Sequence, residues 1–322
     1  MRMPRFFFWT LSGFAVVGVI VALIFFQLPV SIHVRVAENG GFMPSVIKAR
    51  AGEPLKLRLV SDDVEHTFAV GQDFLKPVLL KPNTPVYLTL TFDKAGTYAF
   101  YSTTPSSVNF WRIRGAIEVS GDAPVQPVEP PLYVRLGLKF DEAHEAEGEH
   151  IQLSRKPSAS RGAAFSDKIT LAYLAHDYYV AHSPTEAFKE LRAESALQSL
   201  SAADVWDVVA YIWRKNTSSD ALVNGLVLYQ TNCAACHGVN GAGDGRFANE
   251  MKSATNGFQA PTDFATESHL LEEKTALTQG LILRGGMGTG MPMWGTIFTD
   301  AQTWDVVAHL YSFQFDYQGV DP

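Results

Sequence analysis

The chain has 322 residues, 47% hydrophobic and 18% charged. This composition excludes a disordered protein and predicts two or three folded domains. The net charge of −7 argues against nucleic-acid binding, which requires a basic face. From Ala221 onward, ten acidic residues outnumber four basic ones. This region would therefore attract a basic partner, although it is equally typical of ordinary solubility.

The first element expected is a membrane anchor at residues 1–30. Residues 6–26 carry no charge and are long enough to cross a bilayer as one helix. The alternative is a cleaved signal peptide, but the apolar stretch exceeds a usual signal core and lacks a small-x-small cleavage site. Arg2 and Arg5 precede it, which predicts a cytoplasmic amino terminus and later domains on the outer face.

The next region, 31–121, has the pattern of an all-β sandwich or barrel. Apolar and polar residues alternate in 32–36, 55–60 and 86–92, and Gly- or Pro-containing turns separate these segments. Four prolines follow in 122–132, which predicts a semi-rigid linker.

A helical region is expected at 133–219. Helical periodicity covers 169–182, 184–194 and 202–213. The acidic, histidine-containing run 141–150 before them could suggest a metal site, but such a run is more typical of a solvated surface.

Both cysteines of the chain lie in one motif, Cys233-Ala234-Ala235-Cys236-His237. This spacing lets two thiols form thioethers with the vinyl groups of one haem c while the histidine binds the iron. A thioredoxin-like dithiol would need a βαβ context, and zinc would need two more ligands nearby. With both cysteines in this motif, no structural disulfide, four-cysteine zinc site or dithiolate copper site is possible elsewhere.

The segment 221–313 around this motif resembles the class I cytochrome c family. The resemblance rests on a helix at 224–229, the Cys-x-x-Cys-His motif, Gly290-Met291-Pro292 and a closing helix with Trp304. It implies an all-α cytochrome c domain at 220–322, with His237 and Met291 as axial iron ligands. Met287 and Met293 are the alternative ligands. An iron with both axial positions filled transfers electrons and has no catalytic site.

An internal repeat links this domain to the middle region. Residues 200–212 resemble residues 298–310 at an offset of 98, and in both a Ser or Thr precedes a Trp-containing amphipathic helix. The position 98 residues before Cys233 is Arg135, with no cysteine nearby. We therefore expect the middle region to be a haemless, degenerate cytochrome c-like unit.

The β region resembles the cupredoxin domain of haem-copper oxidase subunit II. The resemblance rests on 41–44, 51–53, 61–68, 95–98 and 115–119. It places His66 at the first copper-ligand position. The remaining ligand positions of the family hold side chains that cannot replace them: Ser102, Ser106, Phe110 and Ile113. We expect the copper site to be lost, with His66 as a remnant.

An anchor, a subunit II-like domain and a cytochrome c together resemble subunit II of haem-copper oxidases with a fused cytochrome. The resemblance implies a non-catalytic subunit, on the periplasmic side of a bacterial inner membrane, that carries electrons from a soluble donor to a multi-spanning oxygen or nitric oxide reductase. The alternatives are a free-standing membrane cytochrome between soluble carriers, and a binding role in which the β and middle regions form a docking scaffold.

Overall fold

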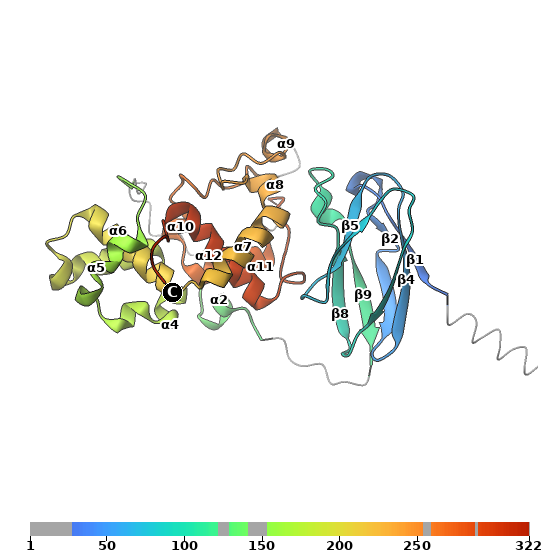
Figure 1. Ribbon diagram of the computed structural model, residues 1–322, viewed down its shortest axis with the longest axis horizontal. Coiled ribbons are helices and arrows are strands. Elements are labelled where there is room, and N and C mark those ends of the chain that lie inside the picture. The colour runs from blue at the N-terminus through green and yellow to red at the C-terminus, as the bar shows by residue number, and fades with distance from the viewer. Residues whose placement is uncertain (1–27, 122–128, 141–152, 254–258, 287–288, 322) are drawn as a thin grey trace, which may run out of the picture.

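The computed structural model describes residues 28–121, 129–140, 153–253, 259–286 and 289–321. A β-sandwich forms one end of the molecule and a helical body forms the other (Figure 1). Residues 1–27 of the expected anchor, most of the linker and the acidic run 141–150 lie outside the described residues. Within the described ranges, no helix is long and apolar enough to cross a membrane.

The sandwich contains two sheets. One has the strand order β2-β1-β4-β7 and the other β3-β9-β8-β5-β6; the β1–β4 and β3–β9 pairs are parallel and the remaining pairs antiparallel. The strands are β1 (Val30–Val34), β2 (Phe42–Met43), β3 (Val46–Arg50), β4 (Pro54–Ser61), β5 (His66–Val70), β6 (Leu75–Leu80), β7 (Val86–Thr91), β8 (Gly96–Tyr101) and β9 (Arg114–Ser120).

The alternation in the sequence places one face of each sheet in a common core. In β4, Leu55 and Leu57 are buried, whereas Lys56 between them is exposed. Phe42, Phe68 and Phe100 meet edge-on or tilted in this core, with ring centroids 5.1–5.8 Å apart. The predicted all-β sandwich is confirmed, and its first strand starts at Val30.

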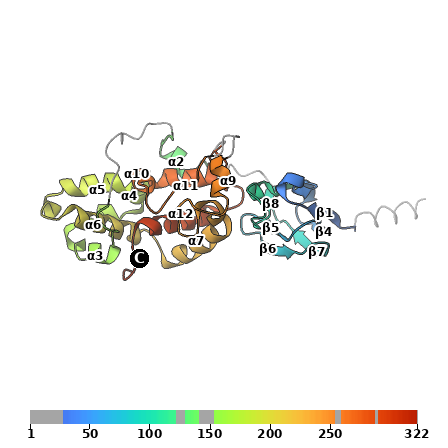
Figure 2. The same cartoon turned by 90° about the horizontal axis from the view of Figure 1, so that it is seen from above.

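The helical body contains eleven described helices. They are α2 (Leu132–Arg135), α3 (Ala159–Ala163), α4 (His176–Ala181), α5 (Pro184–Ala193), α6 (Ala202–Lys215), α7 (Ser219–Asn232), α8 (Ala234–His237), α9 (Ala248–Ser253), α10 (His269–Glu272), α11 (Thr275–Arg284) and α12 (Asp300–Gln314). Figure 2 shows α7 and α9 toward the sandwich and α3, α5 and α6 at the opposite end.

One predicted helix is wrong. Residues 169–182 do not form a continuous helix but a 3₁₀ turn, Leu171–Leu174, followed by α4. Ala175 separates them in an extended conformation (ψ 141°) and serves as the N-cap of α4. The apolar periodicity continued through this break because Tyr173, in the turn, and Tyr179, in α4, are both buried in the same core.

The repeated helices, α6 and α12, begin in the same way. Ser201 and Thr299 each accept a hydrogen bond from the third residue of the following helix, whose side chain accepts one from the cap residue's backbone. A second helix crosses each of them, with a glycine at the crossing point. A Cβ on Gly162 would lie 1.9 Å from the Asp207 carbonyl oxygen, and one on Gly225 would lie 1.9 Å from that of Asp305. The two helix pairs therefore share one packing geometry.

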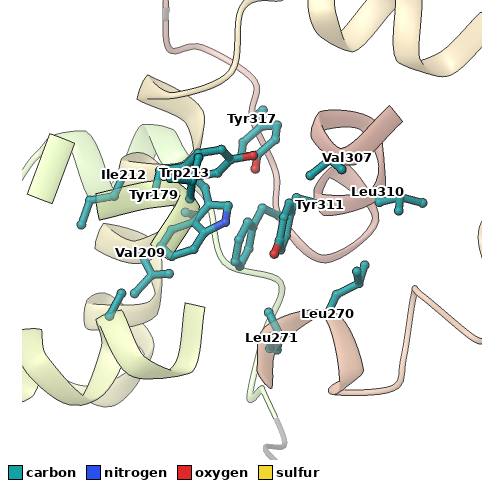
Figure 3. Packing of buried hydrophobic residues seen from close by; sticks show 14 of the residues in the cluster. Tyr179, Val209, Ile212, Trp213, Leu270, Leu271, Val307, Leu310, Tyr311 and Tyr317 are labelled. Carbon is teal, nitrogen blue, oxygen red and sulfur yellow. The ribbon is translucent and has the colours of Figure 1, made fainter. Parts of the chain in front are cut away.

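The middle helices and the carboxyl-terminal helices share one hydrophobic core. Trp213 of α6 is fully buried, and its ring lies 6.1 Å from that of Tyr311 in α12 at 64°. Figure 3 shows Trp213 and Tyr311 on the two sides of the boundary between the repeats, with Tyr179 and Tyr317 nearby. The two helical regions are therefore packed as a single body.

Candidate haem site

The Cys-x-x-Cys-His motif lies at a sharp bend between two helices. Cys233 follows the end of α7, and the single helical turn α8 carries Cys236 and His237. Gly238 ends this turn with φ 78°, a conformation that favours glycine. The Tyr229 hydroxyl donates to the Gly238 carbonyl oxygen at 2.8 Å and fixes the bend against α7.

The glycine-rich loop after the motif folds back over it. The Gly243 N–H donates to the carbonyl oxygen of His237 at 2.9 Å, and the Gly245 N–H donates to that of Cys236 at 3.1 Å. A Cβ on Gly245 would lie 2.5 Å from the Cys236 backbone. The loop therefore needs glycine there for close approach to the motif.

The His237 ring is held by contacts on its edge and its face. Its Nδ1 lies 3.2 Å from the Thr262 carbonyl oxygen, which can only accept, so Nδ1 carries the proton. Phe264 stacks on the ring at 4.8 Å and 22°. Burial lowers the pKa of His237, which favours the neutral imidazole. Nε2 is thus the nitrogen left with its lone pair for a metal, the usual arrangement of an iron-binding histidine.

The structure brings all four predicted haem-binding residues together. Cys233, Cys236, His237 and Met291 line one cavity with an empty volume of about 680 Å³. Three of them, Cys233, His237 and Met291, also line an adjoining cavity of about 1020 Å³. Met291 is half-buried against the core, whereas Met293 is 49% exposed; Met287 lies outside the described residues. Of the two described candidates, Met291 is the one on the cavity wall.

The cavity fits a haem chemically. Burial raises the pKa of the Cys233 thiol to about 12 and that of Cys236 to about 11, so this environment favours neutral sulfur, as in a thioether. Apolar side chains form much of the second cavity's wall: Leu270, Leu281, Ile282, Trp294, Val306 and Leu310. Arg284 also lines it, and its buried Nε has no hydrogen-bond partner among the described residues. A guanidinium at this position suits a haem propionate.

Several cavity residues could not be identified from the sequence. Phe110 and Trp111 come from the β-sandwich, more than 120 positions before the motif, yet they line the same cavity as Cys233. Arg284 and the Thr262 carbonyl carry no motif of their own. A basic residue shortly before the Gly290-Met291-Pro292 loop was the one signal that could have pointed to Arg284.

The copper-ligand positions of the cupredoxin resemblance lie in the sandwich loop before β9 and beside β5. His66 is fully buried, and its Nε2 lies 3.0 Å from Asp63 Oδ1. The Ser102 hydroxyl oxygen accepts from the Thr67 N–H at 3.2 Å, and Ile113 is fully buried in the sandwich core. Nowhere in the described ranges do three or more His, Cys, Asp or Glu side chains form a metal-binding group.

Comparison with known families identifies the haem-bearing segment. The sequence model of the family described as cytochrome c matches residues 222–314. This segment is a cytochrome c domain. The family implies covalently bound haem c and electron transfer, in agreement with the motif and the cavity geometry.

No curated protein matches the chain. Among solved structures, auracyanin from Roseiflexus castenholzii is 15% identical, covers 29% of this chain and 97% of its own, and has a TM-score of 0.24. A chain from a heme-copper terminal oxidase dimer is 18% identical, and the match covers 34% of this chain and 98% of the oxidase chain, with a TM-score of 0.25. The periplasmic domain of cytochrome oxidase subunit II from Bradyrhizobium japonicum is 17% identical. The match covers 24% of this chain and 54% of that domain, with a TM-score of 0.22.

Proposed function

We propose that this chain receives electrons for a membrane-bound haem-copper oxygen or nitric oxide reductase. The observation that carries the proposal is the shared cavity of His237 and Met291 beside the two cysteines of the cytochrome c domain. Haem c supplies one-electron redox chemistry there, and His237 and Met291 would fill both axial positions of its iron. The catalytic metals then belong to another, multi-spanning chain.

Residues 1–30 would anchor this electron carrier in a bacterial inner membrane. The uncharged stretch 6–26 after Arg2 and Arg5 supports this topology, with the amino terminus in the cytoplasm and the folded domains in the periplasm. The acidic cytochrome c domain would face the soluble donor, and a basic donor would associate faster at low salt.

The β-sandwich would hold no copper, and the single haem c would be the only redox centre. Phe110 and Ile113 provide no donor atom at two ligand positions of the resemblance, and both side chains are buried by packing. Metal analysis of the purified chain tests this part, since one or more copper atoms per chain would overturn it.

The middle region would be a haemless copy of the cytochrome c unit. Pairing Gly162 with Gly225 aligns the 3₁₀ turn Leu171–Leu174 with helix α8, Ala234–His237. Thr170, Tyr173 and Leu174 then occupy the positions of Cys233, Cys236 and His237. The offset of 98 residues holds for the closing helices but not for the motif, because the connecting segment is shorter in the first copy.

Affinity purification from gently solubilised membranes tests the assignment to a reductase. We expect a tagged chain to recover a multi-spanning haem protein together with oxygen or nitric oxide reductase activity. A tagged chain carrying His237→Ala provides the haem-deficient control. Recovery of the intact cytochrome alone would contradict the proposal and favour the alternative, a free-standing membrane cytochrome between soluble carriers.

A further inference from the structure

We propose that the β-sandwich covers the haem cavity of its own chain, with Phe110 and Trp111 as the covering side chains. The sandwich would thereby keep water and small hydrophilic molecules from the haem edge and set its redox potential. The inference needs only that the cytochrome c domain holds haem, and it does not depend on the reductase partner.

The covering loop is the connection between β8 and β9. Phe110 is 3% exposed, and its ring stacks on Phe247 of the cytochrome c domain with centroids 6.0 Å apart at 28°. Trp111 is half-buried beside it. Both rings line the same cavity as Cys233 and Cys236. The sandwich thus contributes apolar rings to the wall of the cavity that holds the haem-binding residues.

A second contact fixes this loop to the methionine-bearing loop. Arg114 Nε donates to the Trp111 carbonyl oxygen at 2.6 Å, and its Nη1 donates to the Met293 carbonyl oxygen at 3.1 Å. The same guanidinium lies 5.9 Å from the ring centroid of Trp294. Arg114 therefore holds the covering loop next to the segment that presents Met291.

A third contact lies at the turn between β5 and β6. The Gln72 N–H donates to the Ile297 carbonyl oxygen at 2.7 Å, and its side-chain Nε2 donates to that of Phe298 at 2.6 Å. Asp73 accepts from Gln302 Nε2 at 2.5 Å. Gln72 and Asp73 both have φ 60°, a conformation that is uncommon outside glycine. The turn adopts an unfavourable backbone where it contacts the start of α12.

The fit at this turn leaves no space for a side chain at Gly71. A Cβ there would lie 2.8 Å from both the Ile297 Cα and the Thr296 carbonyl oxygen. The turn and the covering loop contact the cytochrome c domain at separate places, so together they fix the sandwich in one orientation. Backbone hydrogen bonds and stacked rings of this kind indicate a built interface rather than a chance contact.

Such a cover would change the relative stability of the ferric and ferrous states of the haem iron. Excluding water lowers the local dielectric and disfavours the more highly charged ferric state, which raises the redox potential. Removing the cover should therefore lower the midpoint potential. It should also speed reduction by a hydrophilic anion such as ascorbate, which the apolar rings would otherwise keep away.

Two kinds of variant separate the cover from its attachment. Phe110→Ala combined with Trp111→Ala removes the rings. Gly71→Val breaks the attachment at a residue that does not line the haem cavity, and Gln72→Ala is the milder version if Gly71→Val fails to fold. Tyr87→Ala is the matched control, because Tyr87 is 63% exposed on β7 of the other sheet.

We expect both kinds of variant to lower the midpoint potential, to speed ascorbate reduction severalfold and to speed amide hydrogen exchange in residues 293–298. The control should leave all three unchanged. Unchanged potential and reduction rate in the folded ring variant would overturn the proposal. Changes confined to the ring variant, with none in Gly71→Val or Gln72→Ala, would also overturn it, since the rings would then act without docking of the sandwich.

Discussion

Gly225 of α7 lies against the backbone of Asp305 in α12, so close that a Cβ would come within 1.9 Å of the carbonyl oxygen. This approach brings α7 and α12 together, and α7 leads directly into the haem-attachment motif. Gly162 and Asp207 make the same contact in the middle region. The two glycines therefore allow separate tests of the two helix crossings.

Replacing Gly225 with Ala should separate α7 from α12 and disturb the motif. Because both partners of the clash are backbone atoms, we expect a loss of about 3 kcal/mol in the free energy of unfolding and reduced haem incorporation. Denaturant titration and haem content per chain measure these effects. Val227→Ala, on the exposed face of the same helix, should change neither.

Replacing Gly162 with Ala should destabilise the helical body by a similar amount. This crossing lies outside the segment that carries the attachment motif, so the purified variant should keep the absorption spectrum of the parent while its melting temperature falls. Ser160→Ala, an exposed change in the same helix, is the control. A variant that loses its haem spectrum at temperatures where it remains folded would contradict this separation.

Replacing Met291 with Ala should remove the second axial ligand. We expect loss of the charge-transfer absorption band of a ferric His/Met haem, together with a lower midpoint potential. Met293→Ala should keep both properties, because Met293 is half exposed. Survival of the band in Met291→Ala would assign the ligand to Met287 or Met293 instead.

Arg284 should hold a haem propionate through its half-buried guanidinium. Loss of this positive charge in Arg284→Gln favours the ferric state, so the midpoint potential should fall on the order of 30–60 mV, equivalent to roughly 1 kcal/mol. Arg284→Lys should restore most of the potential. Lys252→Gln, an exposed charge removal elsewhere in the domain, should leave it unchanged.

His309 should make the protein less stable in acid. Burial lowers the pKa of this imidazole to about 4 from the ordinary 6.5. Between these values the unfolded chain binds a proton that the folded chain does not, so stability falls as pH decreases from 6.5 to 4, by up to about 1.4 kcal/mol per pH unit. Denaturant titrations at several pH values across this range should show that the free energy of unfolding depends less steeply on pH in His309→Gln than in the parent. An equal dependence on pH would contradict the assignment.

The elements with a strong local signal were predicted from sequence. The strand alternation of β4 and the capped amphipathic helices α6 and α12 all appear where the pattern placed them. The attachment motif and Met291 were predicted to share one site because the spacing resembles that of a known family, and the structure places them around one cavity.

Features that depend on tertiary packing could not be predicted. The break at Ala175 has no glycine or proline to mark it, and the buried tyrosines on both sides preserve a helical pattern. The positions of Phe110 and Trp111 at the haem cavity depend on how two domains meet, which no local pattern encodes. No sequence pattern marks Gly162 as the counterpart of Gly225. The match lies in the close approach of each glycine to a helix backbone, at Asp207 and at Asp305.

The contact of Trp213 with Tyr311 has a consequence for how this protein can be shortened. Because the side chains that fill the core come from both helical repeats, cutting between them would expose a large apolar surface on each half. The haem-bearing half alone should therefore aggregate or mature poorly, even though it contains the whole attachment motif. A unit without an attachment motif of its own would thus be retained because its neighbour depends on it for a complete core.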